Sequence, residues 1–291
     1  MKRILIVGAK SYVGESFSSY LNISKLYSKE HGKYEDVYEV DTLEAHNLKP
    51  RVEQFRRYDV VLFVAGIVHR KETRKNAHLY YEVNRDLAIM VAEVAKQAGV
   101  HQFILISTMA VYGMMEGVIS KNTKPNPTSY YGKSKLQADR AIWKMKEETF
   151  RVAILRPPMI YGNGCKGNYQ NLRKLALKVP VFPKINNKRS MLYIDNLCEF
   201  LKEIIDEDRQ GLFFPQNAEY VNIGEMVYLM GIANGNKVKL TRIFNLAIIC
   251  LKAMPLKTIR KVFGSLRYEK VDIVNRYSFD DSISLTESHI I

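Results

Sequence analysis

A tyrosine and a lysine that stand four residues apart, Tyr131 and Lys135, have the side chains and the spacing of an acid–base pair. Ser129 can cap a helix, and the apolar residues that follow at helical spacing predict that helix. Residues four apart project from one helix face. Because an ammonium favours a neighbouring phenolate, we expect the pKa of Tyr131 to lie below its usual value of about 10. Such a tyrosine can exchange a proton with a carbinol or carbonyl oxygen.

The same spacing also fits two surface residues on an ordinary helix, so the neighbouring elements matter. Residues 2–7 predict a short apolar strand, which a glycine turn and then a helix to about residue 21 follow. This order is typical of the first unit of a dinucleotide-binding fold, in which the turn brings backbone N–H groups to a pyrophosphate. Ser11 stands where a third glycine is usual, and a plain turn is the alternative. The expected cofactor-binding residues are Gly8, Ser11, Tyr12, Val13 and Gly14.

A second strand over residues 37–40 should end at Asp41, where a carboxylate can bind an adenosine ribose and repel a 2′-phosphate. Lys10, in the glycine turn, favours the opposite preference, because an ammonium can pair with that phosphate. Each residue is otherwise an ordinary surface charge. The sequence therefore leaves NAD and NADP open as cofactors.

Two further apolar stretches, residues 59–66 and 102–107, are typical of parallel strands buried on both faces. Between them, residues 84–98 predict a long amphipathic helix that starts at Asn84. Ala65 and Gly66 end the first and leave room for a cofactor backbone, and Thr108 follows the second. Ligands in open parallel sheets bind at these carboxyl ends. The alternation of strands and helices predicts an α/β fold, a doubly wound parallel sheet of the Rossmann type, with a smaller α+β substrate domain at the C-terminal end. We place the dinucleotide-binding domain at residues 1–160, with later segments returning to it, and the substrate-binding region mainly at 161–291.

Composition narrows the classes of function. The 291 residues carry a formal net charge of +14, spread along the chain, and no nucleic-acid-binding signature accompanies it. The three cysteines and six histidines lack the spacing of metal ligands, so no metal site and no disulfide framework are expected. The apolar run near the N-terminus is too short for a signal peptide, and no stretch is long enough to span a membrane.

A basic segment over residues 237–267 surrounds the apolar stretches 243–251 and 262–263. Such a segment can lie on an anionic membrane. The interpretation that we favour from sequence is that its apolar face packs on the substrate domain, so that the protein stays in solution beside anionic vesicles.

Four ordered motifs together resemble the extended short-chain dehydrogenase/reductase family, the NAD-dependent epimerases and dehydratases of nucleotide sugars. The family's Ser-[Ser/Thr]-x-x-Val-Tyr-Gly motif matches residues 107–113, and its Tyr-Gly-x-Ser-Lys motif matches residues 131–135. Arg-Pro-x-x-x-[Tyr/Phe]-Gly matches residues 156–162, and Arg-x-x-x-Tyr-Ile-x-x-Leu matches residues 189–197. The resemblance covers nearly the whole chain and implies NAD or NADP as the cofactor.

The resemblance implies roles for single residues. Thr108, Tyr131 and Lys135 fall on the catalytic positions, with Lys135 also at the nicotinamide ribose and Pro157 near the nicotinamide. Arg189 matches the arginine that holds the diphosphate of the nucleotide sugar, a role that suits a guanidinium. Asn168 matches a substrate-loop asparagine, although a plain turn residue fits that position nearly as well.

A departure from the family narrows the reaction. Sugar 4,6-dehydratases carry Asp-Glu after the catalytic threonine, whereas Met109 and Ala110 stand here and cannot transfer protons. Dehydration is therefore not expected, and Met109 is left as a substrate contact. The chain resembles most the capsule and O-antigen enzymes that reduce UDP-2-acetamido-2,6-dideoxy-4-hexuloses. A UDP-sugar 4-epimerase and a non-catalytic dinucleotide sensor remain as alternatives. The resemblance implies a cytoplasmic enzyme with a UDP-sugar substrate, no stable membrane insertion, no nucleic-acid partner, and a possible homodimer.

Overall fold

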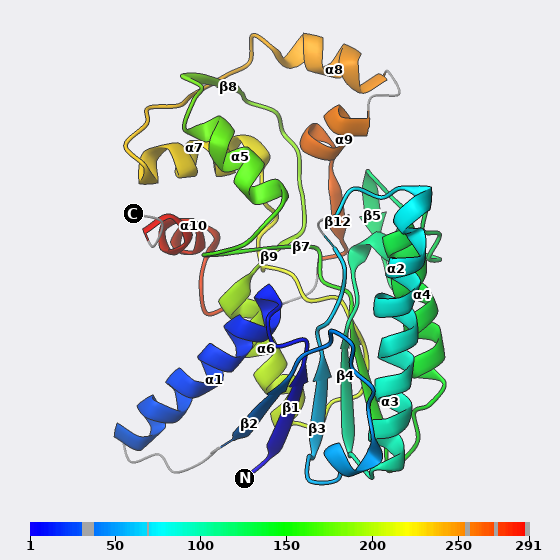
Figure 1. The fold of residues 1–291 in the computed structure, drawn as a ribbon. Helices are drawn as coiled ribbons and strands as arrows, with labels where there is room; N and C mark the ends of the chain where they lie inside the picture. The colour runs from blue at the N-terminus through cyan, green and yellow to red at the C-terminus, as the bar shows by residue number, and fades with distance from the viewer. Residues whose placement is uncertain (31–37, 69, 254–256, 271–272, 289–291) are drawn as a thin grey trace. The chain divides into compact units, whose positions relative to one another are not determined.

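The computed structural model describes residues 1–30, 38–68, 70–253, 257–270 and 273–288 (Figure 1). The chain divides into two compact units, each built from three segments. The first unit holds Met1–Val111, Pro125–Pro157 and Leu197–Pro215, and the second holds Tyr112–Lys124, Pro158–Asn196 and Gln216–Ile291. Residues 112–124, which the sequence analysis placed in the first part, group with the second unit, and residues 197–215 return to the first.

The first unit is built on a six-stranded sheet, parallel throughout, in the order β10-β6-β4-β3-β1-β2. β2 lies on one side of β1, and the chain then crosses over so that β3 lies on the other side. The direction of winding therefore switches between β1 and β3. This arrangement confirms the expected doubly wound α/β fold. The strands are β1 (Arg3–Val7), β2 (Glu39–Leu43), β3 (Val60–Phe63), β4 (Gln102–Ile106), β6 (Arg151–Leu155) and β10 (Gly211–Phe213).

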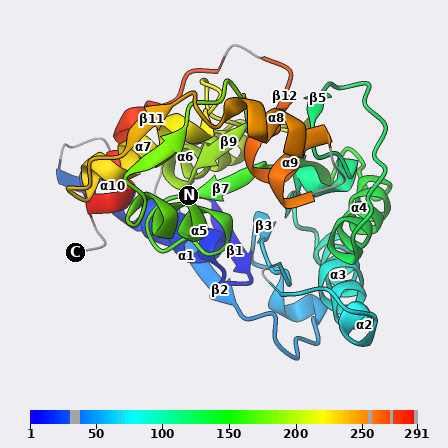
Figure 2. The same ribbon diagram turned by 90° about the horizontal axis from the view of Figure 1, so that it is seen from above.

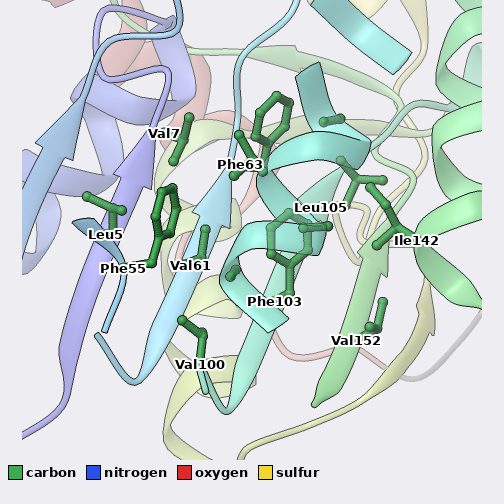
Figure 3. Close-up of a cluster of buried hydrophobic side chains, with 14 of the residues drawn as sticks. Leu5, Val7, Phe55, Val61, Phe63, Val100, Phe103, Leu105, Ile142 and Val152 are labelled. Atoms are coloured by element: carbon green, nitrogen blue, oxygen red, sulfur yellow. The ribbon is translucent and has the colours of Figure 1, made fainter. Parts of the chain in front are cut away.

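Helices cover both faces of this sheet (Figure 1). One face carries α1 (Tyr12–Glu30) and α6 (Ile194–Asp206), and the other carries α3 (Ala88–Gln97) and α4 (Tyr130–Trp143). Figure 3 shows the apolar core on the α3 and α4 side, where Phe63, Phe103 and Ile142 are fully buried. Because both faces of the strands are buried, the strands read as continuous apolar runs.

Two helix boundaries differ from the sequence-based expectation. The helix after the glycine turn continues to Glu30 instead of ending near residue 21. The helix expected from Asn84 begins at Ala77, as α2 (Ala77–Tyr81), and runs through a π-helical turn, η3 (Glu82–Leu87), into α3. Asn84 is thus an internal residue of a continuous helical stretch.

The second unit is smaller and is assembled from three two-stranded parallel pairs and short helices. Its helix α7 packs against α5 and α10 (Figure 2). Buried Glu287 connects α10 to the rest of the unit, because its carboxylate accepts hydrogen bonds from Tyr169, Arg173 and Asn234. The strand pairs are β5 (Gly117–Ile119) with β12 (Leu266–Tyr268), β7 (Met159–Tyr161) with β9 (Met191–Tyr193), and β8 (Val181–Pro183) with β11 (Lys239–Thr241). The helices are α5 (Asn168–Ala176), α7 (Ile223–Ala233), α8 (Asn245–Ala253), α9 (Lys257–Phe263) and α10 (Phe279–Ser288).

The apolar part of the basic segment is not packed as the sequence analysis expected. Ile248 is buried, but Ile243, Leu246 and Ile249 are exposed, because α8 turns only one side toward the rest of its unit. Residues 254–256 of this segment lie outside the described residues. Among the helices that the structure describes, none is both long enough and apolar enough to cross a bilayer.

Gly8, at the end of β1, allows the first turn to pass close to β3. Its φ is +101°, and a Cβ there would lie 2.5 Å from the backbone nitrogen of Ala65. Gly99 has a similar φ of +81° but no heavy atom within 4 Å of its would-be Cβ.

We expect Gly99→Ala to lower the free energy of unfolding by about 1–2 kcal/mol through backbone strain. Gly8→Ala should cost about 1–3 kcal/mol more, because it adds a steric clash. Urea denaturation measures both values, and equal losses would show that the close approach to Ala65 is unimportant.

Candidate active site

Tyr131 lies in the first turn of α4, and three contacts fix the start of that helix. The Ser129 hydroxyl accepts a hydrogen bond from the Gly132 N–H at 3.0 Å, the N-cap that the sequence predicted. The carboxylate of Glu72, far away in sequence, accepts from the N–H groups of Tyr130 and Tyr131 at 2.9 and 3.1 Å. An anionic group suits the positive end of the helix dipole. Glu72 is therefore a positioning residue for Tyr131 that the sequence analysis did not find.

Gly132 brings α4 close to the turn that follows β4. A Cβ on Gly132 would lie 2.7 Å from the carbonyl oxygen of Ala110, so no larger residue fits without displacing that backbone. The Thr108 hydroxyl accepts a hydrogen bond from the Ala110 N–H at 3.1 Å and also hydrogen bonds to the Tyr131 phenol. The structure thus brings two expected catalytic residues, Thr108 and Tyr131, together at the carboxyl end of β4.

Lys135, one turn further along α4, is buried with 3% of its surface exposed. Its ammonium donates to the carbonyl oxygen of Ile106 at 2.9 Å and reaches the carbonyl oxygen of Ala65 at 3.4 Å. Ile106 is the last residue of β4, and Ala65 lies just beyond the end of β3. The Lys135 side chain therefore connects α4 to the carboxyl ends of these two strands. A Cβ on Gly66 would lie 3.4 Å from the same nitrogen. A side chain at position 66 would therefore crowd the ammonium and the buried amide of Asn84, whose Oδ1 would lie 3.2 Å from the same Cβ.

Asp139 continues the face of α4 that carries Tyr131 and Lys135, at the same four-residue interval, and it is 1% exposed. Its Oδ2 accepts a hydrogen bond from Nε of buried Arg156 at 2.9 Å. Burial raises the pKa of Asp139, while Arg156, the Ser107 hydroxyl and Lys135 each oppose that rise. Asp139 is therefore a buried counter-charge behind Lys135, the expected catalytic lysine.

The pKa values of the pair differ from the sequence-based expectation. Burial lowers the pKa of Lys135 to about 8, and the Asp139 charge partly opposes this fall. Burial raises the pKa of Tyr131 to about 12, against a hydrogen bond from Thr108 that lowers it, and Asp139 raises it further. The expected lowering of the Tyr131 pKa was thus wrong, because loss of hydration outweighs the Thr108 hydrogen bond and the Asp139 charge acts in the same direction as burial. At neutral pH Tyr131 holds its proton.

Asn84 is a second positioning residue that sequence reasoning missed. It is fully buried in the π-helical turn η3, and its amide exchanges two hydrogen bonds with the backbone of Ile67, at 2.8 and 3.1 Å. Its Nδ2 also donates to the Ser134 hydroxyl on α4 at 3.3 Å. Asn84 therefore links Ile67, in the segment that follows β3, to the helix that carries Lys135. A polar residue at a core position of an apolar helix was the signal that could have identified it.

The glycine turn has the geometry of a dinucleotide cradle. Ser11 caps α1, since its Oγ accepts from the Gly14 N–H at 3.1 Å and its carbonyl accepts from the Glu15 N–H at 2.9 Å. A Cβ on Gly14 would lie 2.8 Å from the carbonyl oxygen of Gly8, so the turn closes tightly on the helix start. Tyr12 and Val13 form the first turn of α1 and are partly exposed. A pyrophosphate at this helix N-terminus fits the residues present.

Asp41 lies within β2, opposite Leu5, instead of at the end of the strand. Its carboxylate accepts hydrogen bonds from Arg57 and, at 2.8 Å, from the Tyr58 hydroxyl. The first acidic residue beyond the end of β2 is Glu44, which pairs with Lys10 at 2.5 Å. Lys10 therefore forms an ion pair within its own unit. Glu44, which the sequence analysis overlooked, is a candidate for binding the cofactor ribose.

The remaining expected site residues are divided between the two units. Pro157 ends its segment of the first unit, and its carbonyl accepts from the Met109 N–H at 2.8 Å. In the second unit, Asn168 is exposed at the start of α5, and Arg189 donates to the carbonyl of Gly264 at 2.8 Å. Burial lowers the pKa of Arg189, which nevertheless stays charged. In the described part of the chain, no cluster of three or more His, Cys, Asp or Glu residues could hold a metal.

The positions of Asp41 and Glu44 predict different effects on cofactor preference. Glu44→Gln should strengthen NADPH binding relative to NADH, because it removes the carboxylate that follows β2 and releases Lys10 from its ion pair for a phosphate. Asp41→Asn should change the ratio less, because Arg57 and Tyr58 already hold that carboxylate. Titration of each variant with both dinucleotides gives the ratio, and a larger change in Asp41→Asn would return the role to Asp41.

Solved structures of similar fold include sugar-nucleotide enzymes. The dTDP-4-dehydrorhamnose reductase of Bacillus anthracis in complex with NADP aligns with a TM-score of 0.72 at 16% identity over 100% of both chains. The UDP-glucuronic acid 4-epimerase of Bacillus cereus in complex with NAD aligns with a TM-score of 0.72 at 17% identity, over 98% of this chain and 97% of the other. At these identities the likeness establishes the fold.

Sequence comparison gives nearer relatives. The UDP-glucose 4-epimerase of Vibrio cholerae is 28% identical over 94% of this chain and 85% of its own. The N-acetyl-alpha-D-glucosaminyl-diphospho-ditrans,octacis-undecaprenol 4-epimerase of Escherichia coli O157:H7 is 29% identical over 68% of this chain, and the match spans 62% of that relative's length. The model of the NAD dependent epimerase/dehydratase family matches residues 4–224, which include the glycine turn, Thr108, Tyr131 and Lys135. The chain therefore belongs to the NAD dependent epimerase/dehydratase family, and its cofactor is NAD or NADP.

Proposed function

We propose that this protein uses NADH or NADPH to reduce the 4-keto group of a UDP-2-acetamido-2,6-dideoxy-4-hexulose, in the synthesis of bacterial surface polysaccharide. The observation that carries the proposal is the cluster of Thr108, Tyr131 and Lys135 at the carboxyl ends of β3 and β4. Tyr131 holds its proton at neutral pH, which is the state that a reduction needs, because the carbonyl oxygen must receive a proton.

The chemistry divides between the cofactor and the side chains. When bound, a reduced nicotinamide would supply the hydride for C4 of the sugar. Tyr131 gives its phenolic proton to the oxygen on C4, and Thr108 donates a hydrogen bond to the same oxygen. Lys135, held as an ammonium by Asp139, compensates the charge that forms on Tyr131. The product is the 4-hydroxy sugar, and a proton from solvent restores Tyr131.

The sugar nucleotide offers a diphosphate, which calls for a cation. Arg189 uses one guanidinium nitrogen for the carbonyl of Gly264 and has further N–H donors for a phosphate. Both named 4-epimerases act on a sugar that carries a diphosphate, linked to uridine in one relative and to undecaprenol in the other. Asn168 and Met109 complete the proposed substrate contacts. Met109 and Ala110 have no side chain that can transfer a proton, so dehydration is not proposed.

A second candidate is 4-epimerisation with a retained cofactor. The two relatives of 28% and 29% identity are both 4-epimerases, which favours this reaction. Epimerisation begins with oxidation at C4, so Tyr131 would first have to accept a proton as a phenolate. Its raised pKa in the ligand-free protein makes that first step harder than the reduction. A homodimer and a cytoplasmic location accompany both candidates as predictions.

The test is product identification with each cofactor. Incubated with UDP-4-keto-6-deoxy-N-acetylhexosamine, the enzyme should consume NADH or NADPH in proportion to the 4-hydroxy sugar formed. Tyr131→Phe should lower turnover about 10²–10⁴-fold, the usual effect of losing an acid–base group, and should still bind the dinucleotide. Tyr130→Phe, which changes the neighbouring tyrosine, should turn over like the wild type.

Each of the other outcomes would assign a different function to the protein. Conversion of a UDP-N-acetylhexosamine to its C4 epimer, with no net consumption of cofactor, would replace the reductase with the epimerase. Tight dinucleotide binding without turnover of either sugar would point to a sensor. Near-wild-type turnover in Tyr131→Phe would remove Tyr131 from the mechanism.

A further inference from the structure

The solvent side of α8 in the second unit is apolar. Ile243, just before the helix, is 83% exposed, Leu246 is 74% exposed and Ile249 is 64% exposed. At three-residue intervals these side chains share one side of the helix, and the exposed Cys250 lies beside them. Ile248, on the opposite side, is the buried residue that attaches α8 to its unit. Figure 1 shows α8 at an edge of the ribbon, with α9 next to it.

A helix on the surface of a soluble protein normally turns its polar side outward. Here residues 243–251 contain no charged side chain at all, and the buried side and the exposed side are both apolar. Scattered exposed apolar residues are ordinary, whereas a contiguous group of this kind marks a contact surface. The apolar side of α8 therefore requires an apolar partner.

The surroundings of this apolar side are cationic. Arg242 and Lys239 precede α8 and are exposed, and exposed Lys184 is joined to it, since its carbonyl accepts from the Asn245 side chain at 2.9 Å. The pairing of β8 with β11 brings the two segments together, opposing Lys239 to Val181. The sequence has no aspartate or glutamate between residues 226 and 268, nor between 170 and 194. Both paired segments are thus rich in cations and free of acids.

A second copy of this chain does not suit such a surface, because two copies would bring cations together with no acidic residues from these segments to pair with them. Nucleic acid would satisfy the cations but would leave the apolar side chains exposed. We propose that α8 and the cations around it form a docking surface for an anionic lipid bilayer. Ile243, Leu246 and Ile249 enter the interface between headgroups and acyl chains, while Lys184, Lys239 and Arg242 contact anionic headgroups.

This inference does not depend on which sugar reaction the enzyme catalyses. It reverses the sequence-based expectation that the protein stays in the supernatant, because that expectation assumed a packed apolar face. The absence of a membrane-spanning helix among the described residues is compatible with it, since an interfacial helix lies in the plane of the membrane.

The test is cosedimentation of the full chain with vesicles. At about 0.15 M salt the protein should pellet with vesicles of phosphatidylcholine and about one-third phosphatidylglycerol, and should stay in solution with phosphatidylcholine alone. About 1 M salt should weaken binding by screening the cations. Leu246→Glu/Ile249→Glu should lower the bound fraction about tenfold or more. Met90→Glu, which changes a 45% exposed methionine on α3, is the matched control and should bind like the wild type.

Cys250 provides an independent readout, because the other two cysteines are buried. An environment-sensitive fluorophore on Cys250 should shift its emission to the blue when anionic vesicles are added. Circular dichroism and thermal unfolding confirm that each variant is folded. The proposal fails if the wild type stays in the supernatant, or if Leu246→Glu/Ile249→Glu binds as tightly as the wild type. Vesicle binding without a fluorescence shift would place the contact elsewhere, and a dimer that the double variant dissociates would assign this surface to a second copy.

Discussion

The burial of one ammonium group, that of Lys135, is the constraint on which the active site of the first unit depends. A buried charge needs hydrogen bonds and a counter-charge, and here the carbonyl oxygens that follow β3 and end β4 supply the hydrogen bonds. The lysine can reach both carbonyls only where α4 crosses the carboxyl edge of the sheet. The same position of α4 places Tyr131 beside Thr108. The position of Tyr131, the proposed acid–base group, therefore follows from the hydrogen bonds that the buried lysine requires.

Much of the surrounding structure serves that placement. Asp139 supplies a negative charge behind Lys135, and Arg156 keeps that carboxylate paired in a buried region. The ion pair with Arg156 weakens the electrostatic effect of Asp139 on its other neighbours. The Asp139 carboxylate favours the ammonium form of Lys135 but opposes ionisation of Tyr131. Gly132 permits the approach of α4 to the turn after β4. Positioning of the site is thus distributed over residues that touch no reacting atom.

The sequence predicted the elements that local chemistry specifies. The cap at Ser129, the turn from Gly8 to Gly14 and the place of Thr108 after β4 all follow from residue type and spacing. The contact of Glu72 with the start of α4 could not be foreseen in this way, because the two lie 58 residues apart and meet only in the folded sheet. Asp139 could have been found, since it repeats the interval from Tyr131 to Lys135. The sign of the pKa shift at Tyr131 was missed because spacing reveals neighbouring charges but not burial.

The ionisation of Lys135 tests this account most directly. In protein labelled with ¹³C at the lysine Cε, the resonance that disappears in Lys135→Met belongs to this side chain, and its chemical shift reports the protonation of the ammonium. In the ligand-free enzyme it should titrate with a pKa of about 8, and at a lower pH again in Asp139→Asn, where the supporting charge is gone. A Lys135 resonance that titrates at the ordinary lysine value of about 10.4 and does not respond to Asp139→Asn would contradict the account.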